Sequence, residues 1–371
     1  MVKVVEFIHG LNLGGAETLV KNYALLLDPK EFDITVLCIE HFDSPYEKIL
    51  ADAGVKTIFI HDLMKTSQKK GILYKFLNHY LRFYYVKKVL HRLAPDVIHI
   101  HLSLNNYVCV AKPDKNTRLF YTQHNDVSRW KKSCPSDVKA LKWLVRHYQT
   151  RLIAINEAIK QALNQLFEQE ITTVLNNGID QSLYHTPLNK AEKRRSLGIE
   201  ENVFLVVHVG RFSAVKNHEF LLEVFAQLKK KKQEAFLLMV GRGKTEQDIR
   251  RKAAEYGVAD SIKIFYDRTD VPEILRAADA AVFPSISEGL PLSVIEMQVA
   301  GLPCIVSTAV PKDACISNKI CYMSLDEPSQ KWAEELIRLA EDDSPICYNN
   351  LEAWDLNESV RRLGEMYKGE E

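Results

Sequence analysis

The chain has 371 residues, 46% of them hydrophobic and 26% charged, with 49 Lys and Arg against 48 Asp and Glu. This length suggests two domains that each bury a core of their own. The net charge of +1 argues against a dedicated nucleic-acid-binding protein, and the ordinary apolar content argues against disorder.

No apolar run approaches the ~20 residues of a membrane-spanning helix, and the N-terminus has no secretory signal pattern. Seven cysteines without a CxxC pair indicate a reduced, cytoplasmic protein.

The balanced net charge hides a difference between the two halves. Residues 1–185 carry 24 basic and 18 acidic side chains, so their net charge is +6, whereas residues 186–371 carry 25 and 30, a net charge of −5. Within the first half, residues 65–92 include eight basic side chains and no acidic one. The difference indicates two domains with separate partners.

Short apolar runs alternate with amphipathic stretches along the first half. The runs predict strands at 4–8, 34–39, 57–60, 97–101, 119–122, 152–155 and 173–175. Helical patterns lie between several of them, at 16–27, within 73–93 and at 138–149.

The second half repeats this alternation. It predicts strands at 204–209, 236–240, 262–265, 281–283, 304–306 and 321–323, and helices near 217–231, 246–255, 271–277, 292–299 and 330–340. Nearly continuous apolar strands separated by helices imply parallel sheets covered on both faces. The fold class is therefore α/β, with two doubly wound domains in tandem.

A turn-rich stretch at 176–187 marks the domain boundary. We expect a Rossmann-like N-terminal domain at 1–185, a Rossmann-like C-terminal domain at 186–350, and a closing segment at 351–371 that contains a helix at 355–367. Ligands of open α/β sheets bind outside the carboxyl ends of the strands, so two such sheets facing each other would form a cleft. Functional residues are therefore sought just after strands.

The first such loop is Gly10–Glu17, which contains Gly14 and Gly15 and opens a helix. Backbone N–H groups at a helix N-terminus favour an anionic ligand. The spacing does not match GxGxxG, which disfavours a dinucleotide cofactor and an oxidoreductase. The alternative is an ordinary tight turn between a strand and a helix.

A loop after the predicted strand 204–209 carries Arg211 and Lys216. The planar guanidinium and the compact ammonium could together neutralise a diphosphate. Two exposed basic residues on a loop are an equally simple interpretation.

The segment 283–296 places Glu288 in a loop and Glu296 in the following helix. Gly289 allows close backbone approach, and N–H groups from Gly289 through Leu290 to Ser293 would point toward a phosphate or sugar. Glu296 can accept hydrogen bonds from a ribose diol. A capped helix with an acid at each end is the alternative, but the apolar neighbours of Glu296 disfavour it.

Histidines cluster at strand ends of the first half. His99 and His101 share one face of a strand, and His124 precedes the turn-prone Asn125. A metal site is conceivable, but no carboxylate motif completes it, so His99 is expected to be a core residue. Metal-dependent nucleotide-sugar transfer often uses an Asp-x-Asp element, and none occurs in this sequence. The negative charge of a leaving diphosphate would then be neutralised by Arg211, Lys216 and helix N-termini.

The basic stretch 65–92 interleaves aromatic residues with lysines, among them Lys69, Lys70, Lys87 and Lys88. An interfacial helix on an anionic membrane has this composition. A solvated helix whose aromatic face packs on the sheet has it too.

Further short motifs join those above, so that the set along the chain is Gly14-Gly-Ala-Glu17, Asp96–His101, Asn177–Asp180, Gly210-Arg211 with Lys216, Val240–Gly243, Asp270-Val-Pro272, Phe283-Pro-Ser285, Glu288-x7-Glu296 and Ala300–Pro303. In order and spacing, these motifs resemble those of the retaining glycosyltransferases of family 4, which have the GT-B fold. The resemblance runs over nearly the whole chain and includes bacterial polysaccharide-assembly members of that family.

The resemblance implies transfer of a sugar from a nucleotide-diphosphate donor, preferably a UDP-sugar, to a glycan or lipid-linked acceptor. The transfer would retain the anomeric configuration without a bound metal or cofactor. It assigns the nucleotide to the C-terminal domain and the acceptor to the N-terminal domain. The closing helix would return to the first domain.

Residue roles follow from the matching positions. Donor-binding residues would be Gly14, Gly15, Arg211, Lys216, Gly289, Leu290 and Glu296. His124 and Glu288 would lie near the donor sugar and serve catalysis, with His101 and Asn125 on the acceptor side. Membrane contact would fall to Lys69, Lys70, Lys87 and Lys88.

Two departures concern the nucleotide loop and the histidine motif. The loop reads Gly241-Arg-Gly-Lys244 where the family often has Gly-Asp-Gly-Pro, and Gln123-His124-Asn125 replaces the commoner His-Gly. A nucleotide-sugar epimerase of the same fold and a non-catalytic nucleotide-sugar-binding subunit remain alternatives. Incubation with donor alone separates the epimerase from a transferase.

Overall fold

The structure is a computed structural model that describes residues 1–64 and 71–370. It divides into two compact units. The first unit runs from Met1 to Gly178 and also includes the C-terminal segment from Leu356; the second runs from Ile179 to Asp355. The chain passes from the first to the second within the turn-rich stretch 176–187.

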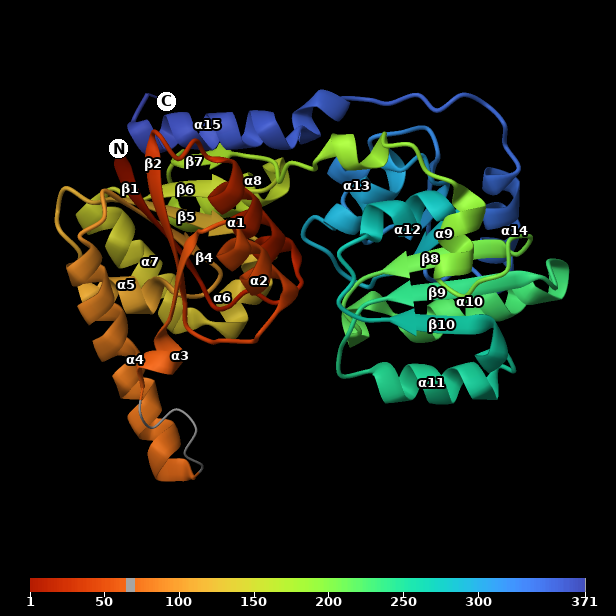
Figure 1. Cartoon of the computed structure of the whole chain (residues 1–371), viewed down its shortest axis with the longest axis horizontal. Helices are drawn as coiled ribbons and strands as arrows, with labels where there is room; N and C mark the ends of the chain where they lie inside the picture. Colours follow the sequence, from red (N-terminus) through yellow and green to blue (C-terminus); the bar gives the residue numbers. More distant parts are fainter. Residues whose placement is uncertain (65–70, 371) are drawn as a thin grey trace. The chain divides into compact units, whose positions relative to one another are not determined.

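The first unit is built on a seven-stranded parallel sheet in the order β3-β2-β1-β4-β5-β6-β7 (Figure 1). Its strands are β1 (Val2–Ile8), β2 (Phe32–Cys38), β3 (Lys56–Phe59), β4 (Val97–His101), β5 (Arg118–Gln123), β6 (Arg151–Ala154) and β7 (Thr172–Val174). Its helices are α1 (Gly15–Leu26), α2 (Pro45–Asp52), α3 (Ile60–Leu63), α4 (Ile72–Leu93), α5 (Asn105–Ala111), α6 (Val127–Ser133), α7 (Pro135–Tyr148), α8 (Glu157–Phe167) and α15 (Leu356–Lys368).

Side-chain alternation along the strands divides this sheet into two faces. On one face, Val4 of β1 and Val97 of β4 share a buried cluster with Tyr23 of α1 and Leu363 of α15. On the other face, the Phe7 ring meets the Tyr107 ring of α5 edge to face, at 6.2 Å between ring centroids. Even-numbered residues of β1 therefore face α1 and α15, the last helix of the chain.

The second unit is built on a six-stranded parallel sheet in the order β10-β9-β8-β11-β12-β13. Its strands are β8 (Phe204–Val209), β9 (Ala235–Val240), β10 (Ile262–Phe265), β11 (Ala280–Phe283), β12 (Cys304–Ser307) and β13 (Ile320–Met323). Its helices are α9 (Lys190–Ser196), α10 (His218–Lys231), α11 (Glu246–Glu255), α12 (Val271–Ala277), α13 (Leu292–Val299) and α14 (Ser329–Ala340).

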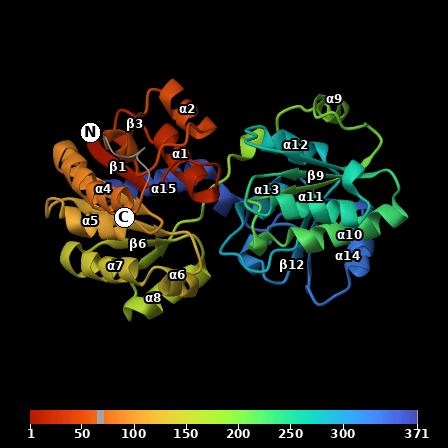
Figure 2. The same ribbon diagram turned by 90° about the horizontal axis from the view of Figure 1, so that it is seen from below.

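One core cluster of the second unit joins α10 and α14 to the sheet. Leu221 and Phe225 of α10 and Trp332 of α14 pack against strand residues such as Val206 and Met239. Helix α12 lies on the opposite side of the sheet (Figure 2). Both faces of the sheet are thus covered, which is why its strands read as continuous apolar runs.

The predicted α/β class and the two parallel sheets are confirmed, with corrections at the level of single elements. The sequence did not predict α2, α5, α6, α8 and α9, although it predicted other helices of similar length, such as α11, α12 and α13. Helix α2 does carry a local signal: Ser44 and Glu47 form a capping box around Pro45. The predicted strand 57–60 ends at Phe59, where α3 begins.

Among residues 1–64 and 71–370, no helix combines the length and the apolar character that a bilayer crossing requires.

Candidate functional site

Most of the predicted site residues follow the strands at which the strand order of each sheet reverses. In the first unit this point lies between β1 and β4, and in the second between β8 and β11. Such switch points are where open α/β sheets bind ligands, at the carboxyl ends of the strands. Arg211 and Lys216 follow β8, and Glu288 follows β11, so the second unit gathers these three residues at one edge.

Lys216 and Glu288 bond to each other. Lys216 Nζ lies 2.8 Å from Glu288 Oε1, and the two side chains are 15% and 12% exposed. The same ammonium lies 4.3 Å from the centroid of the Phe283 ring. Burial lowers the pKa of Lys216, and Arg211 adds to this effect while the Glu288 carboxylate opposes it. The sequence predicted separate ligand contacts for the two residues and did not predict their ion pair.

Backbone contacts hold the loops around this pair. The Ile286 N–H donates to the Val215 carbonyl at 2.8 Å, which ties the Glu288 loop to the Lys216 loop. The Phe212 N–H donates to the Arg242 carbonyl at 2.8 Å, beside the exposed Arg211. These bonds fix the backbone positions from which the side chains of Lys216, Glu288 and Arg211 project.

Close packing of the same loops requires glycine at two positions. A Cβ on Gly243 would lie 2.0 Å from the Phe212 carbonyl oxygen, and one on Gly241 would lie 2.0 Å from the Gly210 carbonyl oxygen. The Gly241–Lys244 departure from the family pattern therefore keeps the glycines that the packing needs.

The other predicted donor residues of this unit lie along the start of α13. Glu296 is half-buried within the helix, Gly289 is half-buried in the preceding loop, and Leu290 is buried. The helix begins at Leu292 with Pro291 as its N-cap residue.

The first unit assembles a buried polar group around the predicted histidines. His101 Nε2 lies 2.8 Å from Glu6 Oε2, and His101 Nδ1 lies 3.1 Å from His124 Nε2. His101 is fully buried, whereas His124 is partly exposed. Both His101 nitrogens thus have protein partners. The side chain is not accessible to an acceptor, which differs from the acceptor-side position that the resemblance implied.

His99 is the core residue that the sequence predicts. Its Nε2 lies 2.7 Å from Thr122 Oγ1, and its Nδ1 bonds to the Tyr367 hydroxyl. Burial, and then the charges of His101 and His124, hold its pKa well below the ordinary value. Burial likewise holds the pKa of His124 well below its ordinary value, with His101 adding to the effect.

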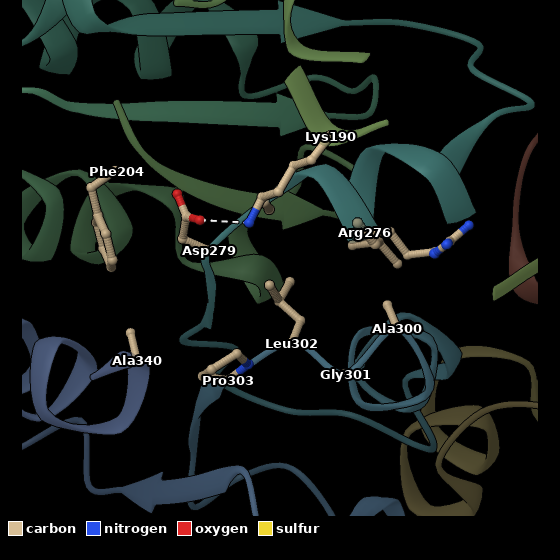
Figure 3. Close-up of a pocket in the computed structure, with 11 residues that line it drawn as sticks. Lys190, Phe204, Arg276, Asp279, Ala300, Gly301, Leu302, Pro303 and Ala340 are labelled. Carbon is tan, nitrogen blue, oxygen red and sulfur yellow. Dashed lines mark hydrogen bonds and ion pairs between the residues drawn. The ribbon is translucent and has the colours of Figure 1, made fainter. Parts of the chain in front are cut away.

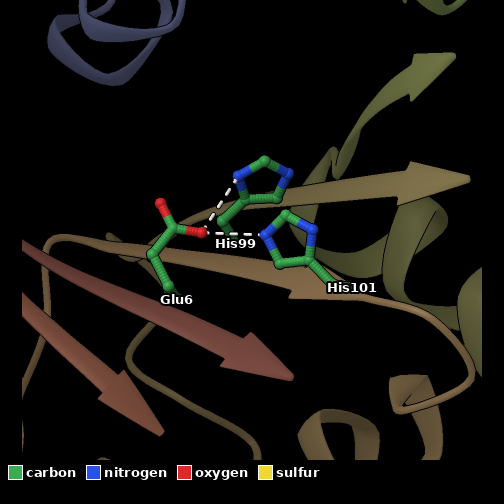
Figure 4. Close-up of side chains that lie close together, drawn as sticks. All are labelled: Glu6, His99 and His101. Carbon is green, nitrogen blue, oxygen red and sulfur yellow. Dashed lines mark hydrogen bonds and ion pairs between the residues drawn. The ribbon is translucent and has the colours of Figure 1, made fainter. Parts of the chain in front are cut away.

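Glu6 is the site residue that the sequence interpretation missed. It pairs in register with His99 across β1 and β4, and it is fully buried. Glu6, His99 and His101 place three potential metal ligand atoms within 4.8 Å of one another (Figure 4). A carboxylate therefore does complete this triad, contrary to the expectation from motifs. The available signal was an acidic residue inside an apolar strand, because buried acids almost always have partners.

The remaining predicted residues of the first unit lie on its surface. Gly14 is the N-cap residue of α1 in extended conformation, and Gly15 is exposed. Asn125 is exposed beside His124. Lys87 and Lys88 are exposed on α4. Lys69 and Lys70 fall outside the described residues.

A shallow pocket of about 370 Å³ lies elsewhere, at the amino end of the second sheet (Figure 3). Its lining includes Phe204 at the start of β8 and Asp279 just before β11. Asp279 is satisfied there by Lys190 and Arg194, each at 2.7 Å. This pocket lies at the amino ends of the strands, whereas Lys216 and Glu288 follow their carboxyl ends. The ion pairs of Asp279 with Lys190 and Arg194 hold neighbouring segments together.

Comparisons with known proteins bear on both units. The sequence profile described as "Glycosyltransferase Family 4" matches residues 13–183, and the one described as "Glycosyl transferases group 1" matches residues 189–355. The chain is a family 4 glycosyltransferase.

Two curated relatives resemble the glycosyltransferase over most of their length. One is the UDP-Gal:α-D-GlcNAc-diphosphoundecaprenol α-1,3-galactosyltransferase of Escherichia coli, 25% identical over 92% of this chain and 90% of the relative. The other is the capsular polysaccharide biosynthesis glycosyltransferase CapH of Staphylococcus aureus, 26% identical over 99% of both chains.

Solved structures confirm the GT-B fold of the glycosyltransferase. HepE of Anabaena, crystallised with UDP and glucose, superimposes with a TM-score of 0.72 at 19% identity, over 99% of this chain and 95% of that one.

Proposed function

We propose that this glycosyltransferase moves a sugar, with retention of configuration and without a metal ion, from a UDP-sugar to a glycan or lipid-linked acceptor in polysaccharide biosynthesis. The observation that carries the donor half is the Lys216–Glu288 pair with Arg211 beside it, at the carboxyl ends of β8 and β11. A cation held in a partly dry site interacts strongly with phosphate oxygens.

Three lines support the choice of donor and acceptor. HepE was crystallised with UDP and glucose, the E. coli relative is named for a UDP-sugar donor and a diphosphoundecaprenol-linked acceptor, and CapH is named for capsular polysaccharide. The proposed metal independence rests on the two cations and on the lack of an Asp-x-Asp element in the sequence.

The proposed roles divide between the units. In the second, Arg211 and Lys216 neutralise the diphosphate, Glu296 holds the ribose, Glu288 lies near the donor sugar, and Gly289 and Leu290 border the phosphates. In the first, Gly14 and Gly15 approach the phosphates, and Asn125 lies on the acceptor side. His124 binds near the reacting sugar.

The proposed chemistry needs no enzyme nucleophile. The bond between the sugar C1 and the phosphate oxygen breaks, the acceptor oxygen bonds to C1 on the same face, and the acceptor proton passes to the leaving phosphate oxygen. The positive charges of Lys216 and Arg211 stabilise the developing negative charge of UDP. Exclusion of water would limit donor hydrolysis.

A thermal-shift screen of nucleotides and nucleotide sugars tests the donor, because a ligand that binds the folded state raises its midpoint. UDP and one UDP-sugar are expected to raise the Tm most. The Glu296→Ala and Lys216→Ala variants are then expected to lose donor binding and transfer. Unchanged binding and turnover in both variants would contradict the proposal, and a new nucleotide sugar formed from donor alone would identify an epimerase.

We further propose that α4 rests on an anionic membrane surface at the inner face of the cell membrane. The aromatic side chains of Phe76, Tyr80 and Tyr84 are 63%, 70% and 57% exposed. Lys87 and Lys88 are exposed on the same helix. Exposed aromatic and basic side chains on one helix are the composition that binds anionic lipid.

Sedimentation with liposomes tests this surface. Binding is expected to require anionic lipid and to weaken when Lys69, Lys70, Lys87 and Lys88 are changed to Gln. The matched control changes Lys230 and Lys231 of α10, which lie in the other unit. Binding that ignores lipid charge, or equal losses in both variants, would contradict the proposal.

A further inference from the structure

A chain of hydrogen bonds inside the first unit converges on Glu6. One arm runs from Thr122 through His99 to the Tyr367 hydroxyl, which lies 2.6 Å from Glu6 Oε1. The other arm runs from His124 through His101 to Glu6 Oε2. The two carboxylate oxygens thus end the two arms.

The direction of each bond follows from the chemistry of these groups. An ionised carboxylate can only accept, so Tyr367 Oη–H and His101 Nε2–H both donate to Glu6. In its neutral form, His101 carries its one N–H on Nε2, so its Nδ1 is a bare acceptor. His124 Nε2–H therefore donates to His101 Nδ1.

The other arm satisfies the same rule. Tyr367 gives its only proton to Glu6, so its oxygen accepts from His99 Nδ1–H, and His99 Nε2 accepts from Thr122 Oγ1–H. Each donor in both arms then points toward Glu6. No imidazole in this scheme needs a second proton, which agrees with the low pKa of His99 and of His124.

We propose that Glu6 is a positioning residue that acts through His101 to hold His124 in its Nε2–H tautomer, which leaves His124 Nδ1 as an acceptor for a substrate hydroxyl. The part concerning substrate rests on the proposed function. Glu6 and His101 touch no substrate in this scheme, since both are fully buried.

Burial explains why the carboxylate can impose this order. Glu6, His99 and His101 have no exposed surface, and Thr122 is 1% exposed. In such a setting, reversing one donor would leave two lone pairs or two N–H groups facing each other, and water could not relieve the mismatch. The order of protons is therefore coupled from one end of the chain to the other.

The last helix of the chain takes part in this coupling. Tyr367 lies on α15 and is itself fully buried, with its ring 5.2 Å from the Phe120 ring and 5.8 Å from the His99 ring between centroids. It occupies the Glu6 oxygen that does not face His101. Helix α15 thus contributes a side chain to the orientation of His124.

The direct test is the tautomer of His124 in the full chain, read from two-bond 15N–1H NMR correlations after 15N-histidine labelling. Loss of one signal in His124→Gln assigns it. The wild-type protein is expected to show the Nε2–H pattern at His124. The Nδ1–H pattern in the wild type would overturn the proposal without any variant.

The Glu6→Gln variant tests the cause. A glutamine amide can donate to His101 Nε2, which would reverse the order and shift His124 toward the Nδ1–H form. The matched control is Asp137→Asn, which removes another buried carboxylate of the same unit, one that accepts from Asn105 and Trp130. The control is expected to keep the wild-type tautomer, and an unchanged tautomer in Glu6→Gln would overturn the proposal.

Kinetics and metal content complete the experiment. Glu6→Gln is expected to lower UDP-sugar turnover at least tenfold and to leave the Kd of UDP within twofold. A stoichiometric metal ion in the wild-type protein that Glu6→Gln releases would instead identify a metal centre and overturn the relay. If the tautomer shifts but the wild type transfers no sugar, the relay stands and the proposed function fails.

Discussion

Lys216 and Glu288 combine two needs in one ion pair. Lys216 must keep its charge in a partly dry site, and the Glu288 carboxylate at 2.8 Å opposes the effect of burial on its pKa. A phosphate group arriving at Lys216 would compete with Glu288 for the same ammonium. Donor binding is therefore expected to weaken this pair and to free Glu288 for a sugar hydroxyl.

Opposite effects are predicted for the two partners. Lys216→Met should weaken UDP binding by about 10- to 100-fold, because a charge-assisted bond contributes about 1.5–3 kcal/mol. Glu288→Gln should leave UDP binding equal or tighter while sugar transfer falls. Calorimetric titration with UDP measures both.

Lys190→Met is the control for this pair. It removes a lysine that is paired with Asp279 at the other edge of the same sheet. Equal UDP affinities in Lys216→Met and Lys190→Met would exclude Lys216 from the diphosphate site.

His218 gives a pH-dependent stability at the residue scale. Burial lowers its pKa from 6.5 to about 2, with His208 and Lys216 adding to the shift. The unfolded chain binds a proton below about pH 6.5 that the folded chain does not bind. The free energy of unfolding is therefore unaffected by His218 above about pH 6.5, and it decreases as the pH falls below that value.

The predicted slope is about 1.4 kcal/mol per pH unit below pH 6 for this group. His218→Phe should flatten the slope by about that amount, since the ring packs edge to face on Phe212 at 4.9 Å between centroids and phenylalanine fits the same aromatic contact. Urea unfolding at pH 7, 6 and 5 measures it. A slope that is unchanged by the substitution would show that His218 is not the titrating group.

At the scale of elements, two loops at the ends of β8 and β9 lock together. The Phe212 N–H donates to the Arg242 carbonyl, and the Gly210 N–H donates to the Val240 carbonyl at 3.0 Å. These two hydrogen bonds set the direction in which the Arg211 side chain projects. Close contact between the loops requires glycine at positions 241 and 243.

Gly243→Ala is predicted to destabilise the second unit by about 1–3 kcal/mol and to weaken UDP binding about tenfold, because its Cβ would overlap the Phe212 carbonyl. Gly257→Ala is the control: its φ of +67° is strained for alanine, but its Cβ would have open space. Thermal unfolding and UDP titration distinguish them. Unweakened UDP binding in Gly243→Ala would show that the lock does not position Arg211.

At the scale of the whole molecule, the chain returns to its first unit at its end. Leu356, Val360, Leu363, Met366 and Tyr367 are buried in the core cluster that includes Val4 and Phe32. Each large apolar side chain contributes about 1.5–3 kcal/mol when fully buried. Helix α15 therefore supplies free energy comparable to the total stability of a domain.

Removal of the residues after Asp355 is predicted to unfold the first unit and to leave the second folded. Leu363→Ala, a milder change, should cost about 2–5 kcal/mol in the first unit alone. Fluorescence of Trp130 reports on the first unit, and that of the buried Trp332 reports on the second. Arg361→Ala, on the exposed side of α15, is the control; an intact first unit in the truncated chain would contradict the prediction.

The sequence by itself determined the fold class, the strands, most of the longer helices and the loops in which the donor-site candidates lie. Buried parallel strands produce continuous apolar runs, and Arg211, Lys216, Glu288 and Glu296 lie in short motifs that follow such runs. Periodicity and motif spacing are local properties, so they can be recognised from neighbouring residues. Local periodicity identified α12 and α13 but missed α2, α5, α6, α8 and α9, so the length of a helix alone did not decide whether it was recognised.

Only the tertiary structure decided which side chains meet. Lys216 and Glu288 are 72 positions apart, and Tyr367 reaches Glu6 across 361 positions. A hydrogen bond depends on a distance of about 3 Å and on the direction of its donor, and neither is encoded in local spacing. Glu6 therefore remained an isolated acid in an apolar strand until the packing of β4 and α15 gave it His101 and Tyr367 as partners.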